Sequence, residues 1–267
     1  MNEKAIGVFD SGVGGLTVLK ALIRRLPEES TVYLGDTARV PYGTKSPEVV
    51  TRYSLANARL LMRQEIKLLV VACNTASSVS LPALAQQLPF PVIGVIEPGA
   101  QAAAAATSTG RVGVIGTPGT IASGAYQSAL GRNRPGAQVL ARACPLFVPL
   151  AEEGWTEGEV VEAIARKDLV DFGPFGIDTL VLGCTHYPML KGAIANVVGA
   201  GVKLVDSAET TATAVEALLA EHKLFAPKGS RPRRRYFVTD LPERFAEIGT
   251  RFLEQPVESA ELVDIQM

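Results

Sequence analysis

The sequence predicts an α/β fold built from two similar halves, and two observations carry that prediction. Residues 68–77 read LLVVACNTAS and residues 179–188 read TLVLGCTHYP, so two apolar runs each end in a cysteine followed by small or polar residues. This pattern is typical of a buried parallel strand whose carboxyl end opens into a turn. Helical patterns separate the strand-like runs, and strands that alternate with helices indicate parallel sheets.

The repeat extends to four strand-like segments in the same order. They begin near residues 5, 31, 68 and 91 in the first half and near residues 111, 137, 179 and 201 in the second. We therefore expect two pseudo-symmetric Rossmann-like domains with central parallel sheets, and an active site in the cleft between them. The first domain is predicted to comprise residues 1–97 plus 208–267, and the second residues 98–207.

Helices are predicted between these strands. Residues 15–26 place their leucines on one face, and residues 46–65 begin at Ser46 and Pro47 like a capped helix. The alanine-rich stretch 99–107 is expected to join the halves. Past Asp206, a helix over 209–220 and the segment 231–253 have no counterpart in the first half, so we expect both to return and pack on the first domain.

Composition limits the classes of function. The chain has 267 residues, 47% of them hydrophobic, and a net charge of −1, so no overall field selects nucleic acid or an anionic membrane. Residues 2–4 run directly into AIGVF without a basic and apolar leader, and no apolar run approaches the roughly 18 residues of a membrane span. We expect a soluble, cytoplasmic protein that acts on a small molecule. Three widely spaced cysteines without a CxxC motif indicate free thiols, with no structural metal.

Cys73 and Cys184 are the strongest candidates for chemistry. A strand-to-helix turn would place each thiol near the positive end of a helix dipole, which is expected to lower its pKa. His186 follows Cys184 by two residues, but nothing equivalent follows Cys73. Across a cleft, one thiolate could take a proton from a carbon while the opposing thiol gives one to the other face. This would invert a stereocentre without a cofactor.

The alternative is that both cysteines belong to the core, as buried cysteines commonly do. For either residue alone that interpretation is the better one. Their occurrence as a pair at matched strand ends favours chemistry instead. Cys144, in RACPLFVP, has no polar companions and is interpreted as a core residue.

The segment Asp10–Gly15, DSGVGG, is a second candidate site. Glycines after a strand let the backbone approach a ligand, and Ser11 would add a hydroxyl. A dinucleotide-binding interpretation uses Gly12, Gly14 and an acid at Asp36, but Thr17 stands where the third glycine is required. A tight turn explains the glycines but not the polar pair Asp10 and Ser11.

Further polar residues follow the same strand ends. Asn74, Thr75, Thr185 and His186 could bind carboxylates, with the Asn74 oxygen accepting from an ammonium group, although helix capping is an equally good explanation. The loop with Pro41, Tyr42 and Gly43 is expected over the same crevice. Glu152 and Glu153 form a pair that is ordinarily solvated, and one of them could balance Asp10 across the cleft.

These motifs together resemble the glutamate racemases of the aspartate/glutamate racemase superfamily. The resemblance runs through GVFDSGVGGLTV, GDTARVPYG, ACNTAS, GVIEPG and LGCTHYP, and faintly through the late YFVTDLPERF. It implies a cofactor-independent interconversion of L- and D-glutamate that supplies D-glutamate for peptidoglycan, and hence a role in cell-wall biogenesis and cell shape. It also implies a homodimer, although no interface can be assigned from the sequence.

The resemblance assigns roles to matching positions. Cys73 would deprotonate the D-isomer and Cys184 the L-isomer, assisted by Asp10, His186 and Glu152. Asp10 would relay protons or meet the substrate ammonium. Because Glu153 is adjacent to Glu152, the resemblance leaves open which of the two serves the site. The residues implied to bind the substrate are Asp10, Ser11, Tyr42, Gly43, Asn74, Thr75, Thr185 and His186.

Three competing functions remain at this stage. The same machinery could racemise aspartate or another acidic amino acid, because the motifs do not reveal the length of the pocket. A nicotinamide-dependent dehydrogenase would require a bound dinucleotide. A nucleic-acid-binding protein would use the basic cluster of Lys228, Arg231, Arg233, Arg234 and Arg235. Such a cluster is usually a solvated loop, so no nucleic-acid partner is expected.

Overall fold

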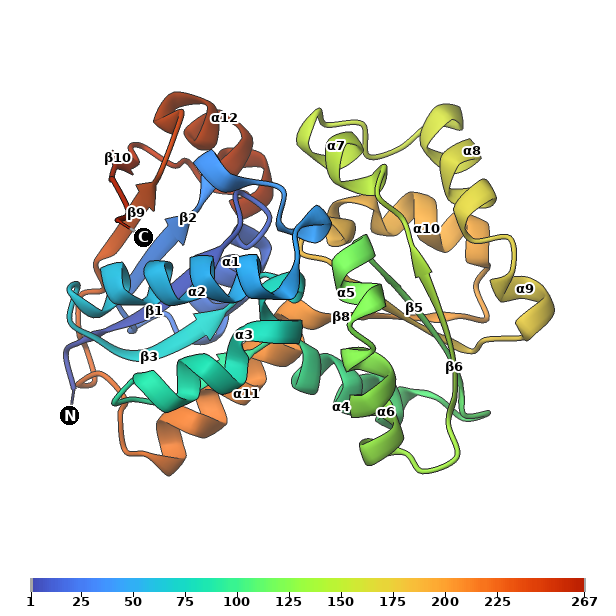
Figure 1. Ribbon diagram of the computed structural model, residues 1–267, viewed down its shortest axis with the longest axis horizontal. Coiled ribbons are helices and arrows are strands. Elements are labelled where there is room, and N and C mark those ends of the chain that lie inside the picture. The colour runs from blue at the N-terminus through green and yellow to red at the C-terminus, as the bar shows by residue number, and fades with distance from the viewer. Residues whose placement is uncertain (1, 267) are drawn as a thin grey trace.

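The computed structural model describes residues 2–266, which form two lobes around two parallel sheets (Figure 1). The first sheet has the strand order β10-β9-β2-β1-β3-β4, and the second β6-β5-β7-β8. In each half the second strand therefore lies beside the first, followed by the third and the fourth. This shared order confirms the predicted pair of pseudo-symmetric Rossmann-like domains.

The strands of the first sheet are β1 (Ala5–Asp10), β2 (Thr31–Gly35), β3 (Ile66–Val71), β4 (Val92–Gly94), β9 (Arg234–Val238) and β10 (Glu261–Leu262). The central strands β1 and β3 are buried on both faces, as parallel strands covered by helices require. Phe9 of β1 pairs with Leu34 and with Val71, so the three strands end at the same edge.

The second sheet consists of β5 (Arg111–Gly116), β6 (Gln138–Ala143), β7 (Thr179–Gly183) and β8 (Lys203–Asp206). Gly116 and Gly183 are paired at the carboxyl ends of β5 and β7. The residues that follow these strands therefore share one edge of the sheet.

Helices cover both sheets. They are α1 (Leu16–Arg25), α2 (Pro47–Met62), α3 (Asn74–Gln87), α4 (Ile96–Ala106), α5 (Pro118–Ala122), α6 (Ala125–Asn133), α7 (Phe147–Glu152), α8 (Glu159–Asp168), α9 (Phe172–Phe175), α10 (Lys191–Val198), α11 (Ser207–Glu221) and α12 (Pro242–Leu253). Short 3₁₀ turns are η1 (Thr37–Arg39), η2 (Tyr42–Thr44) and η3 (Tyr187–Leu190).

The predicted helices are present, with boundaries shifted by up to three residues. Ser46 caps α2 by accepting a hydrogen bond from the Val49 backbone N–H, and Pro47 occupies the first helical position. The alanine-rich helix α4 begins at Ile96, earlier than expected, so Glu97 and Pro98 lie in its first turn. Proline is tolerated there because the first N–H groups of a helix have no partner within the helix.

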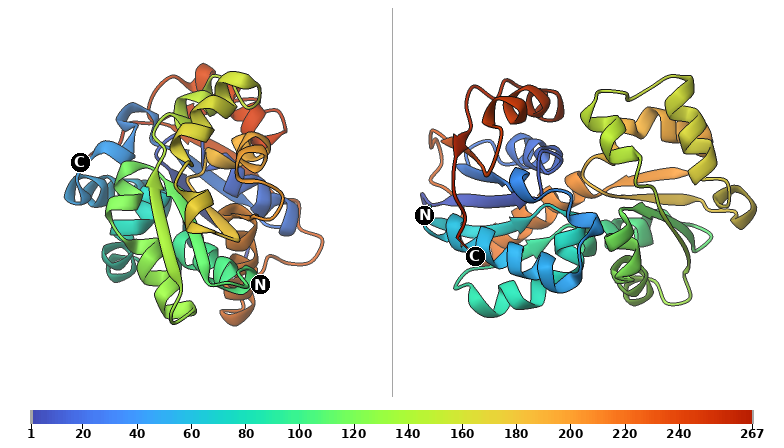
Figure 2. Two further views of the ribbon diagram at one scale, coloured as in Figure 1. Left: turned by 90° about the vertical axis from the view of Figure 1, so that its right-hand side faces the viewer. Right: turned by 45° about the horizontal axis from the view of Figure 1, so that its top comes forward.

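The chain returns to the first lobe after β8. Helix α11 packs along α1 and α4, helix α12 also packs on α1, and β9 extends the first sheet beside β2 (Figures 1 and 2). Strand β10 was not expected from the sequence. The helices α4 and α11 run across the predicted boundaries at residues 97 and 207, so those limits stay a prediction.

Candidate active site

The two cysteines lie at equivalent points of the two sheets. Cys73 follows β3 and directly precedes α3, while Cys184 follows β7 and precedes η3. Their exposed fractions are only 6% and 5%. The Cys73 sulfur lies 3.8 Å from Ser11 Oγ, and the Cys184 sulfur lies 3.8 Å from His186 Nδ1. Each thiol therefore has a polar neighbour.

The expected lowering of the thiol pKa is wrong for Cys73. Burial, and then the negative charges of Asp10 and Cys184, raise the pKa of this thiol to about 12. The Ala76 backbone N–H at the start of α3 and the Ser11 hydroxyl act in the opposite direction, but they are outweighed.

Asp10 connects the two halves. Its fully buried carboxylate accepts a hydrogen bond from the Gly12 backbone N–H at 2.9 Å, and Thr185 Oγ1 donates to its other oxygen at 3.4 Å. Burial raises the pKa of Asp10, and the positive charge of His186 opposes that shift. The first sheet thus presents a carboxylate directly to the residues that follow β7.

His186 and Glu152 form an ion pair beside Cys184. Nε2 of His186 lies 3.0 Å from Oε1 of Glu152, and Nδ1 faces the cysteine. Burial would lower the pKa of His186, but the hydrogen bonds with Cys184 and Glu152 outweigh it and raise this pKa to about 10. Burial would likewise raise the pKa of Glu152, and His186 holds it below its usual value instead. The imidazole is therefore protonated at neutral pH.

The structure distinguishes between the adjacent glutamates. Glu152 points at His186, whereas Glu153 is exposed and pairs with Arg244 of α12 at 3.3 Å. Glu152 is therefore the carboxylate that contacts the site.

Additional hydrogen bonds join the halves around the cysteines. Thr17 Oγ1 of α1 donates to the Thr185 carbonyl at 3.0 Å. Thr75 Oγ1 lies 2.8 Å from Thr117 Oγ1 and 3.2 Å from Thr120 Oγ1, both on the α5 side. Thr117 was not predicted as a site residue, although it occupies the position of Ser11 in the internal repeat, 106 residues later. This equivalence with Ser11 could have predicted Thr117 as a site residue.

Tyr42 and Gly43 approach from the loop after β2. The Tyr42 hydroxyl donates to Asp36 and accepts from Asn57 Nδ2 at 3.0 Å, so its hydrogen-bonding capacity is already used. Gly43 packs so closely on the second half that a Cβ there would lie 2.6 Å from Thr117 Cβ. The tyrosine hydroxyl is thus held by two side chains of the first half.

Asn74 is held by a residue that was not predicted to belong to the site. The hydroxyl of Tyr126, on α6, donates to Asn74 Oδ1 at 2.7 Å. The Asn74 oxygen that was expected to meet an ammonium group therefore already has a donor. No local motif marks Tyr126, since only the fold brings it to Asn74.

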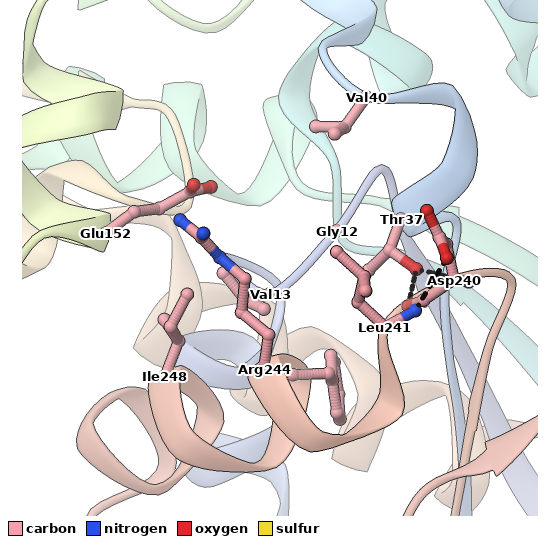
Figure 3. A pocket seen from close by; sticks show the side chains of 10 residues that line it. Gly12, Val13, Thr37, Val40, Glu152, Asp240, Leu241, Arg244 and Ile248 are labelled. Carbon is pink, nitrogen blue, oxygen red and sulfur yellow. Dashed lines mark hydrogen bonds between the residues drawn. The ribbon is translucent and has the colours of Figure 1, made fainter.

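A cavity of about 220 Å³ opens beside this cluster (Figure 3). Gly12 and Val13 line one side, Arg244 and Ile248 of α12 line another, and Glu152 enters from α7. Arg244 points toward Glu152 in Figure 3, and its charge helps to lower the pKa of that carboxyl. The cavity therefore reaches the glycine-rich turn and the His186 ion pair from the same side.

Comparisons with known proteins identify the family. A family model described as Asp/Glu/Hydantoin racemase matches residues 6–215. A glutamate racemase of Geobacter metallireducens is 61% identical over 253 residues, which cover 95% of this chain and 94% of the relative. The chain belongs to the Asp/Glu/hydantoin racemase family. This confirms the resemblance drawn from the sequence motifs.

Solved structures agree with membership in the racemase family. A glutamate racemase from Bacillus anthracis matches with a TM-score of 0.95 and 40% identity, covering 99% of both chains. One from Francisella tularensis, in complex with D-glutamate, matches with a TM-score of 0.93 and 38% identity, covering 100% of this chain and 99% of that one. The two-lobed α/β fold is thus the fold of these racemases.

Two residues behind the competing functions, Asp36 and Arg235, make contacts within this racemase-family chain. Both carboxylate oxygens of Asp36 accept hydrogen bonds from residues of its own loop or from Thr239. The carboxylate that a dinucleotide would need for its ribose is therefore already bonded within the protein. Arg235 of the basic cluster pairs with Glu261 at 3.3 Å. Within residues 2–266, no helix is long and apolar enough to cross a membrane.

Proposed function

We propose that this chain interconverts L- and D-glutamate without a cofactor, using two thiols on opposite faces of the α-carbon. The observation that carries the proposal is the placement of Cys73 and Cys184 at equivalent strand ends, joined across the two halves through Asp10 and Thr185. Membership in the racemase family, with full-length relatives named glutamate racemases, supports the same reaction.

In the proposed step, Cys184 acts as a thiolate toward the L-isomer. It takes the α-proton, the electron pair stays on the substrate as a carbanion, and the Cys73 thiol donates its proton to the opposite face. The reverse reaction begins with Cys73 as the base. The protonated His186, fixed by Glu152, favours negative charge on the Cys184 sulfur. The high pKa of Cys73 is consistent with a thiol ready to donate.

Asp10 is proposed to bind the substrate ammonium group. Its carboxylate is buried near Cys73 and raises the pKa of that thiol. A bound ammonium would offset this negative charge and so allow Cys73 to ionise when the D-isomer is present. Replacing Asp10 with Asn should therefore lower kcat with both isomers, and an unchanged kcat in both directions would contradict this role.

The remaining residues are proposed to hold the two carboxylates of glutamate. Neutral donors and the protonated His186 surround the cysteines, and donors of both kinds match carboxylates in buried sites. Tyr42 and Gly43 would contribute through their backbone, because the Tyr42 hydroxyl is held by Asp36. The side-chain donors in this set are Ser11, Asn74, Thr75, Thr185 and His186.

A polarimetric assay tests the substrate assignment. Purified protein without added cofactor is incubated separately with L-glutamate, D-glutamate and L-aspartate. We expect glutamate to lose optical activity from either isomer at equal kcat/KM, since the equilibrium constant of a racemisation is one. A higher kcat/KM with aspartate would instead assign the chain to the alternative acidic substrate, and no turnover of any of them would contradict the proposal.

Three further elements belong to the proposal. The D-glutamate formed would enter peptidoglycan synthesis, the protein would act in the cytoplasm, and it would form a homodimer. The sequence resemblance supports the first and the last of them. Sedimentation equilibrium tests the homodimer. We expect a mass near twice the 28.2 kDa of the chain, and the mass of a monomer would contradict the dimer.

A further inference from the structure

Tyr126 touches both cysteine-bearing strand ends. Its side chain is buried, with an exposed fraction of 1%. The ring packs on Gly183, the residue before Cys184, so closely that a Cβ at Gly183 would lie 2.9 Å from Tyr126 Cε2. The hydroxyl donates to Oδ1 of Asn74, the residue after Cys73, at 2.7 Å. One side chain thus links the carboxyl ends of β7 and β3.

The hydrogen bond fixes which way the Asn74 amide faces. With Oδ1 held by Tyr126, Nδ2 is turned to the other side. There it is buried and has no hydrogen-bond partner among residues 2–266. An unpaired buried N–H donor is unfavourable, and the cost disappears when a ligand accepts from it. Because the amide carries no charge and donates two hydrogens, a carboxylate is the part of an amino acid that suits it.

We propose that Tyr126 is a positioning residue for racemisation, which aims Asn74 Nδ2 at a carboxylate of the substrate. This inference rests on the proposed function, because it deepens the account of the same site. Tyr126 belongs to α6 of the second half, whereas Asn74 begins α3 of the first. The direction of the amide therefore depends on the two halves being in the arrangement observed.

The test is a double-mutant cycle. Tyr126→Phe keeps the ring on Gly183 and removes only the hydroxyl, Asn74→Ala removes the amide, and a third variant carries both changes. We expect Tyr126→Phe to raise KM for L- and D-glutamate by roughly tenfold, the loss expected for one hydrogen bond to a charged group, with a smaller change in kcat. The double variant should be no worse than Asn74→Ala, since Tyr126 acts through Asn74.

A purely structural role would give a different pattern. Loss of packing would lower the thermal midpoint and add to the effect of Asn74→Ala on KM. Tyr236→Phe, at a half-buried tyrosine on β9, controls for the exchange itself and should keep the wild-type KM. Equilibrium binding of glutarate, which carries two carboxylates and no stereocentre to invert, should weaken by the same factor in Tyr126→Phe.

Two results would overturn the inference. One is a Tyr126→Phe variant with wild-type KM and glutarate affinity, and the other is full additivity in the cycle. Either result would leave glutamate racemisation by the wild type intact. If the wild type did not racemise glutamate at all, the proposed function would fail instead, and glutarate binding would still report on the Asn74 amide.

Discussion

Nε2 of His186 lies 3.0 Å from Oε1 of Glu152, while Nδ1 of the same ring faces the Cys184 sulfur at 3.8 Å. The imidazole therefore connects a carboxylate on α7 to a thiol at the end of β7. The Glu152 carboxylate orients the imidazole ring and keeps the ring protonated. In other active sites, too, a neighbouring group orients the acid or base.

Removing the Glu152 charge should impair the reaction. In Glu152→Gln, His186 loses the partner that keeps it protonated. We expect kcat/KM to fall roughly 100-fold, the lower end of the range typical of acid–base assistance. The fall should be equal for L- and D-glutamate. Glu153→Gln is the matched control, because this exposed side chain pairs with Arg244 instead, and it should stay within about twofold of the wild type. Equal losses in the two variants would remove Glu152 from the site.

The raised pKa of His186 predicts a dependence of stability on pH. Burial opposes protonation, but the partners of His186 raise its folded-state pKa from 6.5 to about 10. The resulting stabilisation is fully present below pH 6.5 and is lost as the pH rises through about 10. Urea unfolding of the wild type and Glu152→Gln should therefore differ by on the order of 1–3 kcal/mol at pH 6, with the difference shrinking toward pH 10. A difference that does not change with pH would contradict the ion pair.

Tyr42→Phe should affect stability more than substrate binding. The Tyr42 hydroxyl links Asp36 to Asn57, so its loss leaves buried polar groups without a partner. We expect the free energy of unfolding to fall by about 1–3 kcal/mol, while KM for glutamate changes less than about twofold. The neighbouring Tyr53→Phe serves as the control for ring chemistry. A large rise in KM with unchanged stability would show that the hydroxyl reaches the substrate.

A buried ion pair far from the cysteines predicts a purely structural effect. Lys67 Nζ lies 2.5 Å from Glu29 Oε2, and both side chains are nearly inaccessible. Lys67→Met leaves the Glu29 carboxylate unpaired and should lower the free energy of unfolding by about 3–5 kcal/mol. Lys20→Met, which breaks the exposed pair with Glu254, should cost less than about 1 kcal/mol. Urea titration measures both, and similar losses would contradict the burial argument.

Local sequence patterns predicted the sheets and the cysteine pair well. Buried parallel strands leave continuous apolar runs, and the internal repeat placed Cys73 and Cys184 at equivalent ends. Helix α2 was also readable, because its cap lies within four residues of sequence. These features depend on neighbours in the chain, which is why sequence reasoning reached them.

Features that depend on tertiary contacts could not be predicted from the sequence. Tyr126 lies 52 residues from Asn74, and no periodicity relates them. The shift in the pKa of Cys73 was predicted in the wrong direction. Burial and the charge of Asp10 raise this pKa more than the helix N-terminus lowers it, and the size of neither effect follows from the sequence. The choice between Glu152 and Glu153 likewise required the position of His186.

The central claim is that two thiols exchange the α-proton from opposite faces. The direct measurement is deuterium incorporation at the α-carbon of glutamate in deuterated water, started from each isomer. It compares the wild type, Cys73→Ser, Cys184→Ser and the control Cys144→Ser, whose buried cysteine is neither of the two proposed bases. We predict deuterium in the product isomer for the wild type and for Cys144→Ser, and loss of racemisation in both other variants. Racemisation that continues in either Cys73→Ser or Cys184→Ser at the wild-type rate, or product formed without deuterium, would contradict the two-thiol mechanism.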